Sequence, residues 1–300
     1  YFKMALFPLL QKIGVPESTI EMNIIKDGYY PFGGGEVSLK VKSIKSLNSI
    51  NLTDRGNPIS IEGIVYGGGI INKKNILEVK KLITQLLYTK IKENDLTNIK
   101  IDIQFKDTFN HVKKAKKQSR NKFENKKQKK QKNKYLNKDD NIDDNKALTF
   151  KDKREIYKEK QKREVGICGT QLILTTSTGC IISGSSLIEN ANSKETISLQ
   201  EVADLSVNRL FENLNSGGCV DEYTMDQLII FMALAKGKSS ILCAGETSMT
   251  SLHLETAIHF TQIFTGVDFK VSDVNINGKI CKLVECEGIN YSYLNMNNNE

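Results

Sequence analysis

Apolar residues recur at helical spacing from Phe2 to Ile13 at the start of the chain, and Gly14 followed by Pro16 ends this pattern. The chain is therefore predicted to open inside a helix. A second helix is predicted to begin at Asn75, whose side chain suits an N-cap. The apolar positions of this second helix share one face: Ile76, Val79, Leu82, Ile83, Leu86 and Leu87.

Alternating or short apolar runs predict strands between and after these helices. The clearest alternation runs from Ile99 to Phe105, where every second residue is apolar, as in a half-buried strand. A glycine-rich turn, Asp27–Val37, separates the first two predicted strands. The predicted strands cover residues 18–25, 36–43, 59–67, 99–105, 170–176, 180–183, 240–243, 268–273 and 279–286.

Further helices are predicted between the later strands. Ser198 and Glu201 have the spacing of a capping box, and the pair Gly217–Gly218 suits the end of the helix that follows them. Asp221 can cap the next helix, and one more helix is predicted over about 254–264. Strands and helices interleave along the whole chain, which predicts α/β or α+β layers.

The formal net charge of +8 is concentrated in one segment. Residues 106–164 hold 22 Lys or Arg and 10 Asp or Glu, whereas the rest of the chain is net −4. This segment is nearly free of apolar residues, so it is predicted to be disordered. Two interpretations stay open: a solvated low-complexity insertion, or an RNA-attracting tether or nuclear-localisation patch. The net charge is therefore a poor guide to the active site.

The six cysteines have no paired CxxC spacing and no nearby histidines, which argues against a zinc site and a disulfide framework. The simplest interpretation is an intracellular protein whose cysteines are reduced. No apolar run approaches transmembrane length. Because the first residue is Tyr1 rather than methionine, the chain is expected to begin partway through a longer protein.

One candidate site lies in Gly217–Gly237, where Tyr223, Asp226 and Gln227 stand at positions i, i+3 and i+4 of a predicted helix. An aromatic ring, a carboxylate and an amide would then share one helix face. Such a trio could stack on a nucleobase and hydrogen-bond to it. By spacing alone, Asp226 and Gln227 fit a solvated first turn of the helix better.

A second candidate is His253, at a predicted loop-to-helix boundary where backbone N–H groups can receive a phosphate. A neutral imidazole there could attack an activated phosphoryl group, although a single histidine among Ser and Thr more often belongs to a polar loop. Of the other histidines, His259 is predicted to be a packing residue, and His111 falls in the low-complexity segment. The glycine triplet Gly33–Gly35 fits a phosphate cradle or a tight hairpin.

Taken in order, several blocks of the sequence resemble consecutive blocks of the RNA 3'-terminal phosphate cyclases, above all the eukaryotic ones. The blocks are GYYPFGGGEV, NLTDRG, TSTGC with SGSS, GGCVDEYTMDQLIIFMALA and LHLETAIHF. The resemblance covers essentially the whole chain except 106–164. It implies a large domain of repeated βα units, formed by residues 1–55 and 219–300, interrupted by a smaller α/β insert domain at 56–218.

The resemblance also implies an activity: ATP-dependent conversion of an RNA 3'-terminal phosphate into a 2',3'-cyclic phosphodiester, with release of pyrophosphate and AMP. The family's adenylylated histidine stands in the LHxxTAI block, which here is His253. Its EYxxDQ block holds the adenylate, which here implies ATP binding by Tyr223, Asp226 and Gln227. A divalent cation, Mg²⁺, is expected to neutralise the triphosphate, with no protein ligand assigned to it. The expected location is the nucleus, with the cytoplasm as an alternative.

Two features depart from the family pattern. The family carries an N-terminal portion with nucleotide, metal and RNA contacts that nothing here matches, and Asp27 and Phe32 replace commoner basic residues. An alternative function is that of the cyclase-like ribosome-biogenesis proteins, which share the fold but act as non-catalytic binding factors in pre-rRNA processing. His253 and the intact EYxxDQ block favour the enzyme, because that branch lacks the nucleophile.

Overall fold

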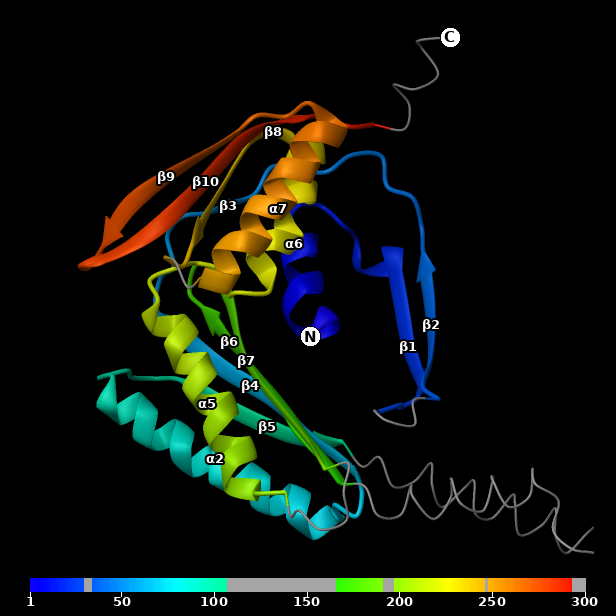
Figure 1. Cartoon of the computed structure of the whole chain (residues 1–300), viewed down its shortest axis with the longest axis vertical. Coiled ribbons are helices and arrows are strands. Elements are labelled where there is room, and N and C mark those ends of the chain that lie inside the picture. The colour runs from blue at the N-terminus through cyan, green and yellow to red at the C-terminus, as the bar shows by residue number, and fades with distance from the viewer. Residues whose placement is uncertain (30–33, 107–165, 191–196, 246–247, 293–300) are drawn as a thin grey trace, which may run out of the picture.

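A mixed α/β fold is seen in the computed structural model of the chain (Figure 1), with three β-sheets and five α-helices in the described residues. None of these helices is long and apolar enough to cross a membrane. The low-complexity segment lies outside the described residues except for Lys106, and so does His111. The described residues are 1–29, 34–106, 166–190, 197–245 and 248–292.

The helices and strands follow one another along the whole described chain. The helices are α1 (Phe7–Lys12), α2 (Lys73–Glu93), α5 (Leu199–Asn215), α6 (Thr224–Leu234) and α7 (Ser248–Thr265). The strands are β1 (Ile20–Lys26), β2 (Glu36–Val41), β3 (Asn51–Leu52), β4 (Pro58–Gly69), β5 (Lys100–Lys106), β6 (Gly166–Thr176), β7 (Ile181–Asn190), β8 (Lys236–Cys243), β9 (Phe269–Ile276) and β10 (Lys279–Ile289). A π-helical turn, Phe2–Leu6, leads into α1, so the chain opens in a helix as predicted.

One four-stranded sheet has the order β3-β8-β10-β9 and carries α6 and α7 on one face (Figure 1). Within it, β3 runs parallel to β8, whereas β10 runs antiparallel to both of its neighbours. Helix α1 lies close to α6 and contributes Leu9 and Leu10 to the same hydrophobic core as Leu228 and Ile241. This core holds the two helices of the candidate site in place.

The other four-stranded sheet has the order β5-β4-β6-β7 and carries α2 and α5 on one face (Figure 1). Strands β6 and β7 are longer than predicted. Thr170 and Ser186 are buried and hydrogen-bonded to each other at 3.1 Å, and Ser186 also donates to the carbonyl oxygen of Val202 in α5 at 2.7 Å. Because polar residues that pair with each other can occupy a core face, hydrophobicity alone underestimates such strands.

Each four-stranded sheet has its own hydrophobic cluster. One cluster includes Ile83 of α2 and Leu210 of α5, and the other includes Leu228 of α6. Ile173 of β6 and Ile181 of β7 belong to the cluster that includes Leu228, on the β3-β8-β10-β9 sheet. The two halves of the fold therefore touch. The division into a large domain and an insert domain stays a prediction.

The predicted N-cap of α2 is wrong by three residues. Asn72 is the cap, because its Oδ1 accepts hydrogen bonds from the backbone N–H groups of Lys74 and Asn75 at 2.8 and 3.2 Å. Asn75 is the third helical residue, and its side chain accepts from the N–H of Asn72 at 3.0 Å to complete a capping box. Asparagine suits both positions, so residue type alone did not decide between them.

Strands β1 and β2 form a two-stranded antiparallel ribbon beside the rest of the fold (Figure 1). In the connection between them Gly34 has a φ of 74°, which fits the hairpin interpretation of the glycine triplet. Near the tip of the ribbon, Asp27 pairs with Lys106 at 2.6 Å, and the ring of Tyr29 stacks on that of Tyr66. These contacts tie the ribbon to β4 and β5.

Candidate active site

The segment that enters helix α6 is held by a buried carboxylate. Asp221 is 1% exposed and accepts backbone N–H hydrogen bonds from Tyr223 at 3.1 Å and Thr224 at 2.8 Å. The backbone N–H of Ser183 in β7 donates to it at 3.0 Å, and the hydroxyl of Tyr1 donates at 2.8 Å. Asp221 therefore supports the helix start as predicted, although Tyr223 occupies the N-cap position itself.

The three predicted nucleotide-binding residues lie together at the start of α6. Tyr223 is the N-cap, and Asp226 and Gln227 belong to the first turn. All three side chains are at least partly exposed. The neighbouring residues that face the core are buried: Thr224, Met225, Leu228 and Ile229. This exposure pattern fits the shared helix face that the spacing predicted.

Tyr223 is 39% exposed, and the edge of its ring is in contact with the ring of Tyr1, with centroids 5.7 Å apart and planes at 78°. Partial burial raises the pKa of its hydroxyl above the ordinary value. The side chain thus stays a neutral phenol at physiological pH. A neutral ring held at one edge is suited to stacking on a planar ligand.

His253 lies within α7 and not at a loop-to-helix boundary, so that prediction is wrong. The helix begins at Ser248, which places His253 in its second turn. The residues before Leu252 are mainly Ser and Thr, so the helix starts without the apolar periodicity that marks its later turns. The argument from free N–H groups at a helix start therefore does not apply to His253.

Packing of α7 against α6 brings His253 next to Asp226, with 3.9 Å between the imidazole Nδ1 and the carboxylate Oδ2. The histidine side chain is 67% exposed and that of Asp226 27%. Burial raises the pKa of the Asp226 carboxyl above its ordinary value, against the opposing effects of the Gln227 backbone N–H and of His253. The other carboxylate oxygen, Oδ1, is buried and has no hydrogen-bond partner. Asp226 therefore keeps one buried acceptor unsatisfied.

Asp226 and His253 line a groove of about 550 Å³ between α6 and α7. Most of the other lining residues come from α7: Leu252, Thr256, Ala257, Phe260, Thr261 and Phe264, with Ile230 from α6. Sequence reasoning did not single these residues out, although many of them follow His253 at helical spacing, which is the signal that could have found them. Tyr223 and Gln227 are not among the lining residues, so the structure brings together two of the four predicted site residues at this groove.

His259 was predicted to be a packing residue, and this is wrong. Its side chain is exposed, and its ring lies edge-on to that of Phe260 with centroids 5.4 Å apart. The apolar residues next to His259 in the sequence lie on other faces of α7. His259 does not line the groove that holds His253.

Comparison with known families identifies the relatives of this chain. The family model described as RNA 3'-terminal phosphate cyclase matches residues 1–271. The chain belongs to the RNA 3'-terminal phosphate cyclase family. The match covers both halves of the described fold, including Asp226 and His253.

Two curated relatives carry the same family name. A probable RNA 3'-terminal phosphate cyclase of Dictyostelium discoideum is 29% identical over 297 residues, which is 96% of this chain and 54% of the relative. An RNA 3'-terminal phosphate cyclase of Drosophila melanogaster is 23% identical over 291 residues, covering 97% of this chain and 61% of the relative. The chain therefore spans less than two thirds of either relative's length.

ATP is commonly bound together with a divalent cation, and the groove offers such an ion little from the protein. Within the described ranges, no three His, Cys, Asp or Glu side chains are grouped closely enough to hold a metal ion. Of the lining residues, Asp226 alone carries a carboxylate, and its Oδ1 lacks a partner. Mg²⁺ is often bound by one or two carboxylates together with substrate phosphates. The Oδ1 of Asp226 is closed to solvent and its Oδ2 lies near His253, so the described lining residues offer such an ion no open carboxylate oxygen away from the histidine.

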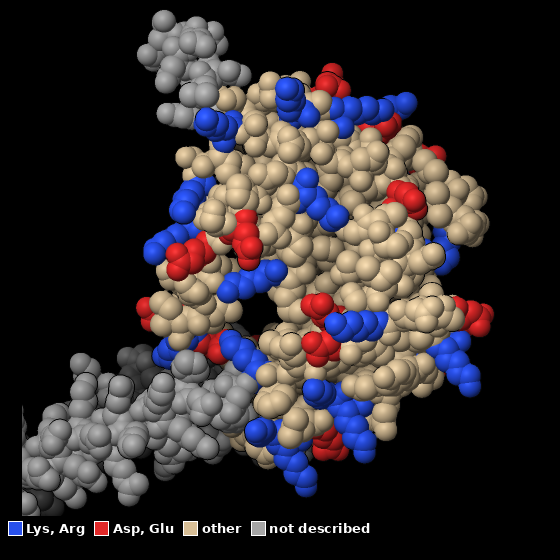
Figure 2. All heavy atoms as spheres, turned by 180° about the vertical axis from the view of Figure 1, so that it is seen from behind, with Lys and Arg blue, Asp and Glu red and all other residues tan. Residues whose placement is uncertain are grey.

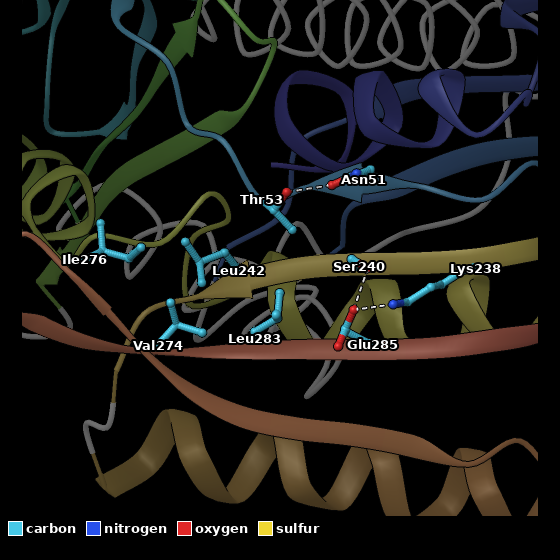
Figure 3. Close-up of a pocket in the computed structure, with 9 residues that line it drawn as sticks. All are labelled: Asn51, Thr53, Lys238, Ser240, Leu242, Val274, Ile276, Leu283 and Glu285. Atoms are coloured by element: carbon cyan, nitrogen blue, oxygen red, sulfur yellow. Dashed lines mark hydrogen bonds and ion pairs between the residues drawn. The ribbon is translucent and has the colours of Figure 1, made fainter.

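A second groove of about 460 Å³ lies over the first sheet (Figure 3). Its one cationic side chain, Lys238, is paired with Glu285 at 2.7 Å, and the hydroxyl of Ser240 donates to the same carboxylate at 3.3 Å. The positive charge is therefore already neutralised by a carboxylate. This groove holds no histidine among the described residues that line it, whereas the α6–α7 groove holds His253 beside Asp226, so the α6–α7 groove is the candidate active site of this cyclase-family chain.

Proposed function

We propose that this protein converts RNA 3'-terminal phosphates into 2',3'-cyclic phosphodiesters with ATP, and that His253 is its nucleophile. The observation that carries the proposal is the Asp226 carboxylate 3.9 Å from Nδ1 of the exposed His253. A carboxylate beside one imidazole nitrogen controls which nitrogen holds the proton. A reactive histidine needs this control, whereas a solvated surface histidine does not.

In the first step, Asp226 favours the tautomer of His253 with its proton on Nδ1, so that Nε2 keeps its lone pair. Nε2 attacks the α-phosphorus of ATP, a P–N bond forms, and the bond to the pyrophosphate oxygen breaks. The phosphoramidate divides one difficult transfer into two easier ones. The Nδ1–Oδ2 separation is longer than a hydrogen bond, so we expect it to shorten when nucleotide binds.

In the second step, an oxygen of the RNA 3'-phosphate attacks the phosphorus of the histidine adenylate. The P–N bond breaks and Nε2 regains its lone pair. The RNA end now carries AMP, which is a good leaving group. The neighbouring ribose 2'-hydroxyl then attacks the terminal phosphorus at very high effective concentration, and AMP departs as the ring closes.

Tyr223 and Gln227 are proposed to hold the adenylate. They lie on the exposed side of α6 next to Asp226, where an aromatic ring and an amide can meet the base or sugar of a nucleotide bound at His253. The apolar side chains of Leu252 and Phe260 offer further surface along the groove. We expect further nucleotide contacts to come from regions equivalent to the part of the relatives that this chain does not cover.

The direct test uses the full natural polypeptide that contains this chain. It is incubated with Mg²⁺ and ATP labelled at the α-phosphate, and acid-labile label on the protein is measured. Wild type should take up label, His253→Ala should take up none, and RNA ending in a 3'-phosphate should discharge the label and gain a cyclic end. His259→Ala is the matched control, because it removes an exposed histidine of the same helix that does not line the groove.

Asp226→Asn tests the role of the carboxylate separately from that of the nucleophile. The amide keeps the shape but not the charge, so label uptake should be slowed at saturating ATP rather than abolished. If the wild type takes up no label while the folded protein still binds RNA, the non-catalytic factor becomes the better description. Equal labelling of His253→Ala and wild type would exclude His253 as the nucleophile.

A further inference from the structure

Two cysteine thiols, Cys180 and Cys219, lie against each other where the β6–β7 hairpin meets the segment leading into α6. A parallel β-bridge joins the residues that follow them, Ile181 and Val220. Strands joined in this way lie about 4.8 Å apart, within the separation of roughly 4.4–6.8 Å that a disulfide needs between Cα atoms. Each of the two thiols has the largest influence on the pKa of the other, and the Cys180 thiol also donates to the carbonyl oxygen of Asp54 at 3.5 Å. Both side chains are buried in the same hydrophobic cluster.

The surroundings of Cys180 favour its thiolate. The hydrogen bond from the Cys219 thiol lowers the pKa of Cys180, with further help from the hydroxyls of Thr178 and Thr176 and from the Lys12 ammonium, against the opposing effect of burial. Lys12 reaches this place because Gly179 has no side chain, and its ammonium fills the space where a Cβ would lie. For Cys219 the same hydrogen bond and burial raise the pKa of the thiol.

The pKa of Cys180 is therefore lowered and that of Cys219 raised, which is the difference expected between a reacting and a resolving cysteine. A thiolate next to a cation is the nucleophile in thiol chemistry, and a neighbouring thiol can complete a disulfide. The other described cysteines lack this combination, because burial raises the pKa of all of them: Cys168, Cys243, Cys281 and Cys286. At Cys281 the nearby Arg55 and Lys279 do not reverse that direction. The chain has six free thiols in the structure, so both partners are in the reduced form.

We propose that Cys180 and Cys219 form a peroxide-sensitive dithiol site that closes to a disulfide. The Cys180 thiolate attacks one oxygen of hydrogen peroxide, the O–O bond breaks, and a sulfenic acid and hydroxide are produced. The hydroxide takes up the proton that the Cys180 thiol released and becomes water. Cys219 sulfur then attacks the sulfenic sulfur, an S–S bond forms, and a second water leaves. Two thiols lose two electrons in all, and one peroxide gains them.

The disulfide would join the start of β7 to the segment before α6. These two segments already meet through the hydrogen bond from the backbone N–H of Ser183 to Asp221. The covalent link would therefore strengthen an existing contact between the two halves of the fold. This proposal is independent of adenylylation at His253, because neither thiol lines the groove that holds it.

The test treats the reduced natural protein with limiting hydrogen peroxide at neutral pH, alkylates the remaining thiols, and maps peptides by mass spectrometry. The expected product is a peptide pair joined through Cys180 and Cys219, lighter by two hydrogens, that disappears on reduction. In Cys219→Ser the cross-link should be lost, and a Cys180 sulfenic acid should instead be trapped by dimedone. Lys12→Met, which leaves both thiols in place, should slow oxidation of Cys180.

The matched control is Cys168→Ser, which removes a buried cysteine outside this pair and should leave the cross-link unchanged. The proposal is overturned if peroxide joins other cysteines first, for example Cys243 to Cys281. It is also overturned if Cys180 in the folded wild type is alkylated and oxidised no faster than Cys168. The wild-type measurement needs no variant, so a variant that fails to fold cannot leave the proposal undecided.

Discussion

At the scale of single residues, Asp221 and Asp226 are near neighbours in the sequence with opposite surroundings. The Asp221 carboxylate accepts four hydrogen bonds, from Tyr1, Ser183, Tyr223 and Thr224. Asp226 keeps one buried oxygen without any partner. The first arrangement is what a structural carboxylate needs, and the second, an unsatisfied buried acceptor beside a histidine, is more common at functional sites.

We expect Asp221→Ala to destabilise the fold by about 3 kcal/mol, because the backbone N–H groups of Ser183, Tyr223 and Thr224 and the hydroxyl of Tyr1 lose a carboxylate acceptor. The free energy of unfolding in urea is the measurement. Glu212→Ala, which removes an exposed carboxylate of α5, is the control and should change stability little. A loss no larger than that of the control would show that water replaces the carboxylate and that Asp221 is not needed to hold α6.

Asp226→Asn, unlike Asp221→Ala, should not destabilise the fold at neutral pH. Burial raises the pKa of Asp226 in the folded state above its unfolded value, so the folded state binds the proton more tightly. The contribution of Asp226 to the free energy of unfolding therefore falls as the pH rises from the unfolded-state pKa to the folded-state pKa. At neutral pH the variant, which has no charge to bury, should be at least as stable as wild type while it adenylylates more slowly.

Urea unfolding of Asp226→Asn and wild type, at acidic and at neutral pH, checks this expectation. Asp268→Asn, a change at an exposed carboxyl, is the control. A variant that is clearly less stable than wild type at neutral pH would mean that the Asp226 carboxylate has a structural partner.

At the scale of elements, close packing of β7 on α5 depends on one glycine. A Cβ added at Gly184 would lie 2.7 Å from the Cβ of Leu210 and against the backbone of α5. Gly68 of β4, in contrast, has no atom within 4 Å of the place where a Cβ would lie. Both residues are glycines in strands, so only the neighbouring helix distinguishes them.

Gly184→Ala should therefore destabilise the fold by about 2 kcal/mol, because α5 must move away from the sheet. Gly68→Ala is the matched control and should be nearly neutral. Thermal or urea unfolding of the two variants side by side measures the difference. If both variants unfold like wild type, the contact between β7 and α5 is looser than the structure indicates.

At the scale of the whole molecule, the net positive charge lies in the low-complexity segment and not in the rest of the chain. On the face shown in Figure 2, basic and acidic side chains are interspersed over the described residues. Residues 106–164, in contrast, hold 22 basic and 10 acidic residues. The segment starts and ends beside β4, because Lys106 pairs with Tyr66 and Gly166 pairs with Gly69.

These pairings predict that residues 107–165 can be replaced by a short Gly/Ser linker without unfolding the protein. The two ends are about two strand spacings apart across the sheet and three residues apart along β4, roughly 14 Å in all, which about eight residues span easily. Label uptake from ATP should be unchanged, whereas RNA affinity at low salt, and its dependence on salt, should fall. Unchanged salt dependence of RNA binding would identify the segment as a solvated insertion.

The sequence by itself determined the order and type of most elements, because apolar periodicity reports which side of a helix or strand is buried. It also carried the family resemblance, through the EYxxDQ block and the LHxxTAI block around His253. Its errors came where polar residues decide the local structure. The capping role of Asn72, the length of β6 and β7 and the start of α7 all depend on side-chain or backbone hydrogen bonds that hydrophobicity does not record.

Only the tertiary structure decided which residues meet. It placed Asp226 of α6 beside His253 of α7 and Cys180 beside Cys219, in each case from distant parts of the chain. Spacing in a sequence is informative within one helix or strand, because the backbone repeat converts it into a direction. Between elements the direction depends on how the cores pack. That packing left Asp226 partly buried with an unsatisfied oxygen, and no pattern in the sequence predicts it.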